Sequence, residues 1–187
     1  MGISIISGII FLMCCFLVIG KKTDTIDKKV STFVTTHRKN GVTFVMHFFT
    51  ELGKGVPTIL VCLSFLFFVN YKYLLQSLVI VLLSTVILCR GLKITIQRER
   101  PKNNRLVEEI DYSFPSSHAL TSAALYGTIA FNMVDIVPQL QSVIIVICVL
   151  FPFLIGFSRV YLGIHYLFDI VGGWSLGLCI ASLVYYL

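Results

Sequence analysis

Residues 140–187 decide the fold: they read LQSVIIVICVLFPFLIGF (140–157), SRVYLGIHYLFD (158–169) and IVGGWSLGLCIASLVYYL (170–187). The polar stretch Ser158–Asp169 follows one apolar run, Leu140–Phe157, and leads into another, Ile164–Leu187. Each run approaches the roughly 20 residues that an α-helix needs to cross a bilayer. The pattern predicts two membrane-spanning helices with a group of polar residues near the end of each.

The composition of the whole chain supports this interpretation. Hydrophobic residues make up 57% of the 187 residues and charged residues only 13%, which is not the composition of a soluble domain of this length. The apolar runs are Ile3–Gly20, Val56–Tyr71, Tyr73–Leu92, Ala119–Val137, Leu140–Phe157 and Ile164–Leu187. We therefore predict an all-α, polytopic membrane protein with six transmembrane helices in one bundle, and a single membrane-embedded domain over residues 1–187.

Three features of the runs refine this prediction. The first run is preceded by no Lys or Arg and followed by no small-residue cleavage site, so we expect a retained span and not a signal peptide. A short turn near Asn70–Lys72 forces the second and third spans to be antiparallel. The cysteines all fall inside the runs, which favours a role in apolar packing: Cys14, Cys15, Cys62, Cys89, Cys148 and Cys179.

A long basic segment, Lys21–Lys54, separates the first two runs. Apolar residues recur in it at helical spacing, at Phe44, Val45, Phe48, Phe49 and Leu52. This spacing predicts an amphipathic helix that lies at the membrane interface or leads into the second span. The basic residues of the segment could attract anionic lipid headgroups or an anionic substrate, or could simply be solvated.

His165 and Asp169 are four residues apart, so on a helix they would share a face. A carboxylate in that position can accept the imidazole Nδ1–H and leave Nε2 with a free lone pair that can attack an electrophile. Arg159 precedes them across Gly163, and its guanidinium suits phosphate oxygens. Alternatively, an interfacial arginine lies beside a His–Asp pair that only satisfies itself.

Two further polar motifs lie in the long segment after the third span. Lys93 and Arg100 are seven residues apart, which on a helix places them roughly 10 Å apart along one face, with Pro101 as the helix stop. Cations near a helix C-terminus are also favoured by the helix dipole alone, and this would account equally for Arg98 and Lys102.

The second motif is Pro115-Ser116-Ser117-His118, immediately before the fourth span. Proline followed by serine suits a helix start, where free backbone N–H groups can bind an anion. A histidine in the first turn could protonate a leaving group. A capping serine beside an incidental histidine is the alternative.

Topology places the three motifs together. The loop after the third span and the loop after the fifth are separated by two crossings, so both lie on one membrane face. Fourteen of the fifteen Lys and Arg residues fall on that face, with Lys72 as the exception. This convergence favours a shared site for a phosphate-like anion.

The motifs Lys93-x6-Arg100-Pro101, Pro115-Ser116-Ser117-His118 and Ser158-Arg159-x5-His165-x3-Asp169 resemble, in order, the three signature motifs of the type 2 phosphatidic acid phosphatase family. The resemblance implies that His165 attacks phosphorus and forms a phosphohistidine, while Asp169 holds its ring. It implies that His118 protonates the leaving oxygen and later activates water. No metal or other cofactor is implied, because side chains supply the positive charge.

The remaining residues of the motifs would bind the phosphoryl group. The resemblance assigns this role to Lys93, Arg100 and Arg159, with Ser116 completing the cradle. The family usually has glycine where this chain has Ser117, so the serine would narrow the site or add a hydroxyl donor to it. The departure removes no catalytic group.

A protein with little mass outside its spans would meet a headgroup at the interface, which favours a lipid phosphate over a sugar phosphate. The compact size resembles that of bacterial members that act on phosphatidylglycerophosphate, undecaprenyl diphosphate, phosphatidate or diacylglycerol pyrophosphate. The expected partners are therefore a lipid phosphate substrate and membrane lipids, with no nucleic acid and no obligate protein partner.

Two observations bear on which side of the membrane the site faces. The positive-inside tendency would place the basic face in the cytoplasm. The bacterial members that the chain resembles have their sites on the outer face, and several of the cations have a catalytic reason to be present. We expect a multi-pass protein of the cell membrane with its active site on the extracytoplasmic face.

Two other classes of function are compatible with parts of the pattern. A lipid-phosphate-binding relative with weak or no activity would keep the fold but lose a histidine or a cation, and none is missing. A small transporter would place ionisable residues at mid-bilayer depth. Most predicted spans lack such residues, so a metal-independent lipid phosphate phosphatase is the preferred interpretation.

Overall fold

The computed structural model describes residues 1–64, 72–102 and 104–187. Within these residues the chain is all-helical. In order, the elements are α1 (Gly2–Ile19), α2 (Asp24–Thr36), α3 (Asn40–Leu52), α4 (Gly55–Ser64), α5 (Lys72–Ile96), α6 (Ser117–Ile136), the 3-10 turn η2 (Pro138–Leu140), α7 (Gln141–Tyr161) and α8 (Leu167–Tyr185).

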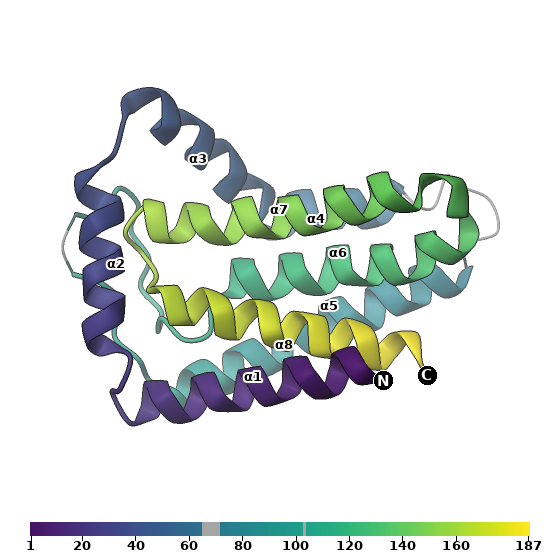
Figure 1. Cartoon of the computed structure of the whole chain (residues 1–187), viewed down its shortest axis with the longest axis horizontal. Helices are drawn as coiled ribbons and strands as arrows, with labels where there is room; N and C mark the ends of the chain where they lie inside the picture. Colours follow the sequence, from purple (N-terminus) through teal and green to yellow (C-terminus); the bar gives the residue numbers. More distant parts are fainter. Residues whose placement is uncertain (65–71, 103) are drawn as a thin grey trace.

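Helices α6 and α8 form the centre of a bundle whose long helices run side by side (Figure 1). Helix α6 packs against α5, α7 and α8, and α8 packs also against α1. About half of the residues of α6 and α8 are buried, compared with about a quarter in α1, α5 and α7. The outer helices therefore present apolar faces away from the core, as expected where lipid surrounds a bundle.

Small residues let α6 and α8 approach closely. A Cβ at Gly177 would lie 2.4 Å from the Leu120 carbonyl oxygen, and one at Gly173 would lie 2.8 Å from the Ser116 carbonyl oxygen. The hydrophobic effect drives helices together only weakly in lipid, so close packing of this kind stabilises the helix pair instead. Through them, the start of α8 is fixed against the start of α6.

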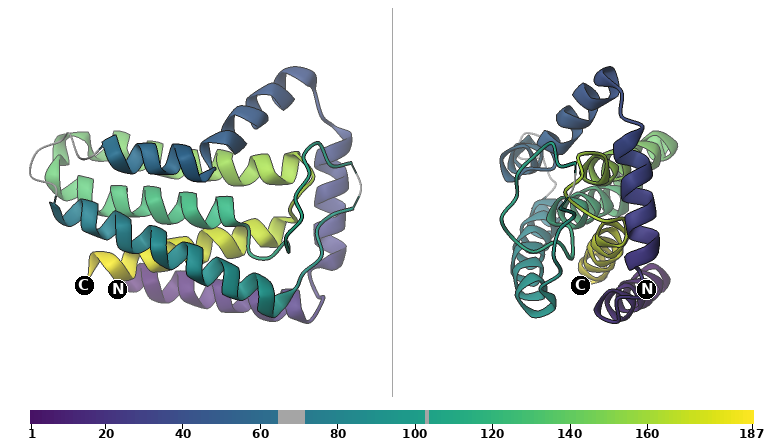
Figure 2. Two further views of the ribbon diagram at one scale, coloured as in Figure 1. Left: turned by 180° about the vertical axis from the view of Figure 1, so that it is seen from behind. Right: turned by 90° about the vertical axis from the view of Figure 1, so that its left-hand side faces the viewer.

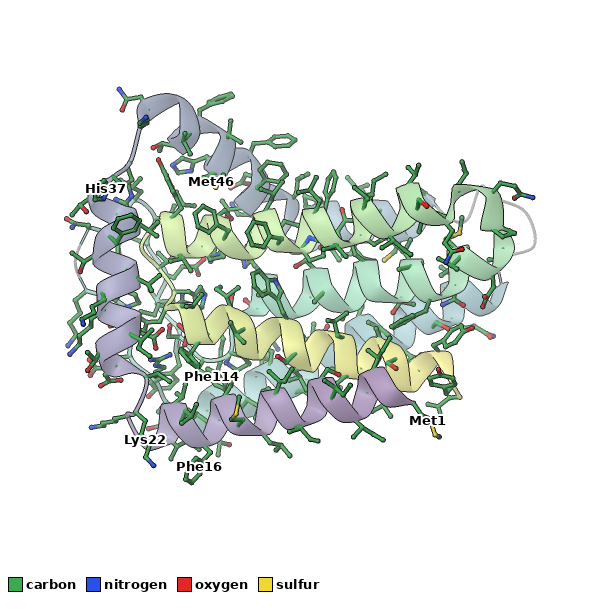
Figure 3. All side chains as sticks on the ribbon, in the orientation of Figure 1. Met1, Phe16, Lys22, His37, Met46 and Phe114 are labelled. Carbon is green, nitrogen blue, oxygen red and sulfur yellow. The ribbon has the colours of Figure 1, made fainter. Side chains whose placement is uncertain are left out.

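Phe114 fills the space between α1 and α8 (Figure 3). Its ring stacks on Phe11 with a centroid distance of 6.3 Å. A Cβ at Gly172 would come within 2.7 Å of the Phe114 ring, so the glycine leaves room for it. The segment that leads into α6 is thus anchored in the core.

Helix α2 lies across one end of the bundle, and α3 leads from it back to α7 and α4 (Figures 1 and 2). The structure therefore has two helices in Lys21–Lys54, where the sequence predicted one. Helix α3 contains the predicted apolar residues Phe44–Leu52, and Met46 from this helix packs with Tyr161 and Ile164.

The described residues contain five helices long and apolar enough to cross a membrane, in α1, α5, α6, α7 and α8. They coincide with five of the six predicted spans to within a few residues, so the chain is an all-helical membrane protein. The predicted second span, Val56–Tyr71, is present as α4 up to Ser64. Its remainder, and most of the predicted turn Asn70–Lys72, lie outside the described residues.

One predicted helix end is wrong. Pro101 was expected to stop the helix that carries Lys93 and Arg100, but α5 ends at Ile96. Gln97 follows with φ +50°, in the left-handed region that does not continue an α-helix. Arg98 and Arg100 therefore lie on an irregular segment that crosses the end of the bundle, and not on a shared helical face with Lys93.

Candidate active site

Hydrogen bonds to backbone carbonyl oxygens join the segments that carry the three motifs at the end of the bundle near α2. Ser116 N–H donates to the Asp169 carbonyl oxygen at 3.1 Å, and Leu106 N–H donates to the Leu162 carbonyl oxygen at 3.0 Å. Arg100 Nη1 donates to the Ile164 carbonyl oxygen at 3.0 Å. The prediction that the motifs share one face is confirmed.

The four-residue spacing suggested that His165 and Asp169 share a helix, but His165 lies in the loop before α8. Gly163 turns the chain with φ +78°, and a Cβ there would lie 2.7 Å from the Asn104 carbonyl oxygen. Asp169 is in the first turn of α8, where its Oδ2 accepts the Tyr166 N–H at 2.8 Å. A helix cap thus brings the carboxylate to the histidine.

The hydrogen bonds of His165 fix its tautomer. Arginine only donates, so the contact of 3.0 Å from Arg100 Nη1 makes Nε2 an acceptor. The proton is therefore on Nδ1, which faces Asp169 Oδ2 at 3.4 Å and Ser113 Oγ at 3.3 Å. Ser113 also hydrogen-bonds to Asp169 Oδ2. In this arrangement the Nε2 lone pair points toward the guanidinium group of Arg100.

His165 is completely buried, and burial together with the nearby Arg100 and Arg159 guanidinium groups lowers its pKa well below the usual value. The imidazole is therefore neutral at pH 7, as a nucleophile must be.

The three predicted phosphate-binding cations all pair with carboxylates. Lys93 Nζ lies 2.5 Å from Asp111 Oδ2, and Arg100 Nη2 pairs with Asp111 Oδ1. Arg159 Nη2 lies 2.6 Å from Glu109. Lys93, Arg100 and Arg159 are each at most 5% exposed, so three buried cations converge on two carboxylates of a single loop.

Partial burial raises the pKa of Asp111, but the hydrogen bonds and charges of Lys93 and Arg100 outweigh this and bring it to about 2. Asp111 is therefore ionised at every pH at which a phosphatase is assayed. A phosphoryl oxygen could bind Lys93 and Arg100 where the Asp111 carboxylate now does, because both groups are anionic and accept hydrogen bonds from guanidinium and ammonium groups.

Several buried polar atoms have no hydrogen-bond partner within the part of the chain that the structure describes: Ser116 Oγ, both ring nitrogens of His118 and Arg159 Nε. Each such atom costs about 1–3 kcal/mol unless a ligand or water satisfies it. Ser116 stands at the N-cap of α6, yet its side chain makes no cap hydrogen bond, contrary to the prediction from the Pro-Ser pair. Its hydroxyl is free to bind an anion.

His118 is held by packing. A Cβ at Gly53 would lie 2.7 Å from both His118 Cδ2 and Ile155, so the end of α3 closes over the imidazole. Ser117 begins α6 and is half-buried.

A cavity of about 480 Å³ opens beside the cations. Its walls include Arg100, Glu109 and Asp111 from the site, together with Arg98, Lys102 and Arg105. Four cations thus line the cavity together with three carboxylates, Glu99, Glu109 and Asp111.

The sequence prediction missed Ser113, Glu109, Asp111 and Thr50. Thr50 Oγ1 accepts a hydrogen bond of 2.7 Å from Arg159 Nη1, although the two residues are far apart in the chain. None of these residues stands at a fixed spacing from another site residue, so no pattern in the sequence could have revealed them.

Comparison with known proteins identifies relatives of this chain. Residues 73–187 match the sequence profile of the PAP2 superfamily. The chain is 31% identical over 180 residues to phosphatidylglycerophosphatase B of Bacillus subtilis (strain 168), a match that covers 93% of this chain and 89% of that protein. It is 30% identical over 145 residues to an undecaprenyl-diphosphatase of Sulfolobus acidocaldarius, with 74% and 67% covered.

A crystal structure of a transmembrane PAP2-type phosphatidylglycerolphosphate phosphatase from Bacillus subtilis has the same fold. The TM-score is 0.89 at 30% identity, over 98% of this chain and 94% of that one. The similarity therefore extends to the helices that precede residue 73.

Proposed function

Because this chain belongs to the PAP2 superfamily, we propose that it is a membrane lipid phosphatase that removes the terminal phosphate of a phospholipid or polyprenyl phosphate through a phosphohistidine at His165. The relatives named above act on phosphatidylglycerophosphate and undecaprenyl diphosphate, which share a terminal phosphate on a membrane lipid. Phosphatidate and diacylglycerol pyrophosphate share this group as well.

The observation that carries the proposal is the convergence of three buried cations and an Nδ1-protonated His165 on one point. The phosphoryl group takes the place of the Glu109 and Asp111 carboxylates beside Lys93, Arg100 and Arg159. Its oxygens also reach Ser116 Oγ and Arg159 Nε, which otherwise lack partners.

In the first step, the Nε2 lone pair of His165 attacks phosphorus and forms a P–N bond. The P–O bond to the lipid breaks, and His118 gives its proton to the leaving oxygen. The imidazole gains positive charge as the bond forms, and Asp169 stabilises that charge through Nδ1–H. The cations hold the three phosphoryl oxygens throughout.

In the second step, His118 is neutral and removes a proton from water. The water oxygen attacks phosphorus, the P–N bond breaks, and its electron pair returns to Nε2. Inorganic phosphate leaves and the site returns to its initial state. Side chains alone supply the charge in both steps, so we propose that the reaction needs no metal.

The same proposal includes the arrangement in the membrane. Residues 1–187 form a single membrane-embedded domain. Helix α4 begins the predicted second span, which brings the number of spans to six, and α2 and α3 lie at the membrane interface on the side of the site. The site faces the extracytoplasmic side of the cell membrane, and no protein partner is required. Lys93, Arg100 and Arg159 belong to the site, so their charges do not count as surface charges in the positive-inside comparison.

The test is phosphate release from detergent-solubilised lipid phosphates in the presence of a chelator. The intact chain is compared with His165→Ala and with His37→Ala, an exposed histidine at the end of α2 that serves as the control. We expect chelator-resistant release that disappears only in His165→Ala, and the preferred lipid identifies the substrate. Release that survives His165→Ala contradicts the mechanism.

A binding protein without activity is the second candidate, and it is favoured only by Ser117 in place of glycine. If the intact chain binds lipid phosphate without releasing phosphate, Ser117→Gly should restore activity.

A further inference from the structure

Arg98 bridges the catalytic helix and the helix that lies across the bundle end. Its Nη1 donates to Asp169 Oδ1 at 2.6 Å, and its Nη2 donates to Asp27 Oδ2, on α2, also at 2.6 Å. Nη2 also reaches Thr23 Oγ1 at 3.1 Å, and the guanidinium lies 4.6 Å above the Tyr166 ring. Both carboxylates are fully buried, and the side chain of Arg98 is only 10% exposed.

Asp27 has a second contact with the catalytic segment. Its Oδ1 accepts the Phe168 N–H at 3.1 Å. Phe168 stands in the first turn of α8, whose N–H groups have no partner within the helix. Helix α8 thus begins between two carboxylates, Asp169 from its own first turn and Asp27 from α2. The contacts hold the loop that carries His165 in one position.

The charges of this network favour the reaction at His165. Asp27 and Asp169 are two negative charges and Arg98 is one positive charge, so these three side chains carry a net charge of −1 on the Nδ1 side of a neutral imidazole. Asp24 Oδ1 lies farther from Arg98 Nη2, at 3.9 Å, and the Arg100 guanidinium faces the Nε2 side. A phosphorylated imidazole gains positive charge, which this net charge balances. Without Arg98, two buried carboxylates would face each other without a cation, and their repulsion would move one of them.

We infer that Arg98 and Asp27 are positioning residues for this reaction: they hold Asp169 so that its Oδ2 faces Nδ1 of His165. The inference rests on the proposed function. Arg98 donates hydrogen bonds to two carboxylates and a threonine, and neither Arg98 nor Asp27 is required to touch the phosphoryl group. Helix α2, outside the three motifs, is therefore part of the catalytic machinery.

This role predicts a separation of the kinetic constants. Misplacement of a catalytic group by about 1 Å can reduce a rate about a hundredfold. We therefore expect Arg98→Gln to lower kcat by about tenfold to a hundredfold, with KM changed by less than about twofold. Asp27→Asn should lower kcat less, since Arg98 still binds Asp169. Lys29→Gln is the matched control, because Lys29 is an exposed cation on α2 that lies away from the site.

The double variant Arg98→Gln/Asp27→Asn distinguishes two explanations for a loss of activity. Either the charge balance positions Asp169, or the hydrogen bonds only hold the fold together. Arg98→Gln leaves the network with a net charge of −2, and the added Asp27→Asn returns it to −1. We expect the double variant to recover about tenfold in kcat over Arg98→Gln. If bonds only held the fold together, the second substitution would remove more of them and activity would fall further.

The experiment measures kcat and KM in detergent at a temperature at which gel filtration and thermal unfolding show each variant folded. Arg98→Lys is included because it keeps the charge but cannot bridge two carboxylates as a guanidinium does, and we expect an intermediate kcat. The inference is overturned if kcat of Arg98→Gln is unchanged, if its KM rises instead, or if the double variant is no better than Arg98→Gln. Failure of the proposed function is distinct, because the intact chain would then release no phosphate.

Discussion

Asp111→Asn should tighten phosphate binding, although it removes a charged residue from the site. In the structure Asp111 binds both Lys93 and Arg100, so an incoming phosphoryl group must displace its carboxylate. Asparagine has nearly the same shape but no charge, and it would compete far less for the two cations.

The size of the effect follows from the pKa of Asp111. Burial opposes ionisation, yet the two cations bring the pKa from 3.8 to about 2, which stabilises the charged form by about 2 kcal/mol at most. About half of the side chain is exposed, 51%, so solvent screening reduces this to about 1 kcal/mol. Removal of the competing charge should therefore lower the inhibition constant of inorganic phosphate by about fivefold.

The assay is inhibition of lipid phosphate hydrolysis by inorganic phosphate, with Glu108→Gln, an exposed neighbour, as the control. A depressed carboxyl pKa means that the ion pairs are present above pH 3.8 and are lost only as pH falls toward 2. The ratio of the inhibition constants should therefore be the same at pH 5 and pH 8. An unchanged or raised inhibition constant for Asp111→Asn would refute the idea that the carboxylate stands where phosphate binds.

Three further predictions test other parts of the structure. Burial beside Arg100 and Arg159 lowers the pKa of His165, so at acidic pH the unfolded chain binds a proton that the folded chain does not. The melting temperature should therefore fall as pH drops below about 6.5, and it should fall less in His165→Ala. Gly163→Ala should reduce the free energy of unfolding by about 1–2 kcal/mol through its positive φ, and by more through the contact of the new Cβ with the Asn104 carbonyl oxygen at 2.7 Å, as measured by thermal denaturation. Thr50→Val removes the acceptor for Arg159 Nη1 and should raise KM by about tenfold; the melting temperature should also fall, because a buried N–H is left without a partner.

The sequence predicted the class of fold because hydropathy records the bilayer directly. Five spans were found within a few residues of their positions, and the convergence of the motifs followed from counting crossings. Helix ends were predicted less well. The end of α5 at Ile96 depends on the left-handed backbone of Gln97, and Arg98 is drawn to carboxylates on α2 and α8.

The candidate site was predicted only where its residues occur at recognisable spacings. His165, Asp169 and the three cations were found in this way. Asp27, Thr50 and Ser113 were not, because each reaches the site through a tertiary contact that leaves no trace in local sequence. Asp27 in particular looks like one more charge on a basic surface segment, yet it is fully buried.

The central claim is that His165 carries the phosphoryl group, and covalent trapping tests it most directly. The protein is mixed with a lipid phosphate labelled in its terminal phosphate, quenched in alkali, and digested for mass spectrometry. We expect label on His165 as a phosphoramidate that is stable to alkali and lost in acid. Label on another residue, or label that persists in His165→Ala, would contradict the claim.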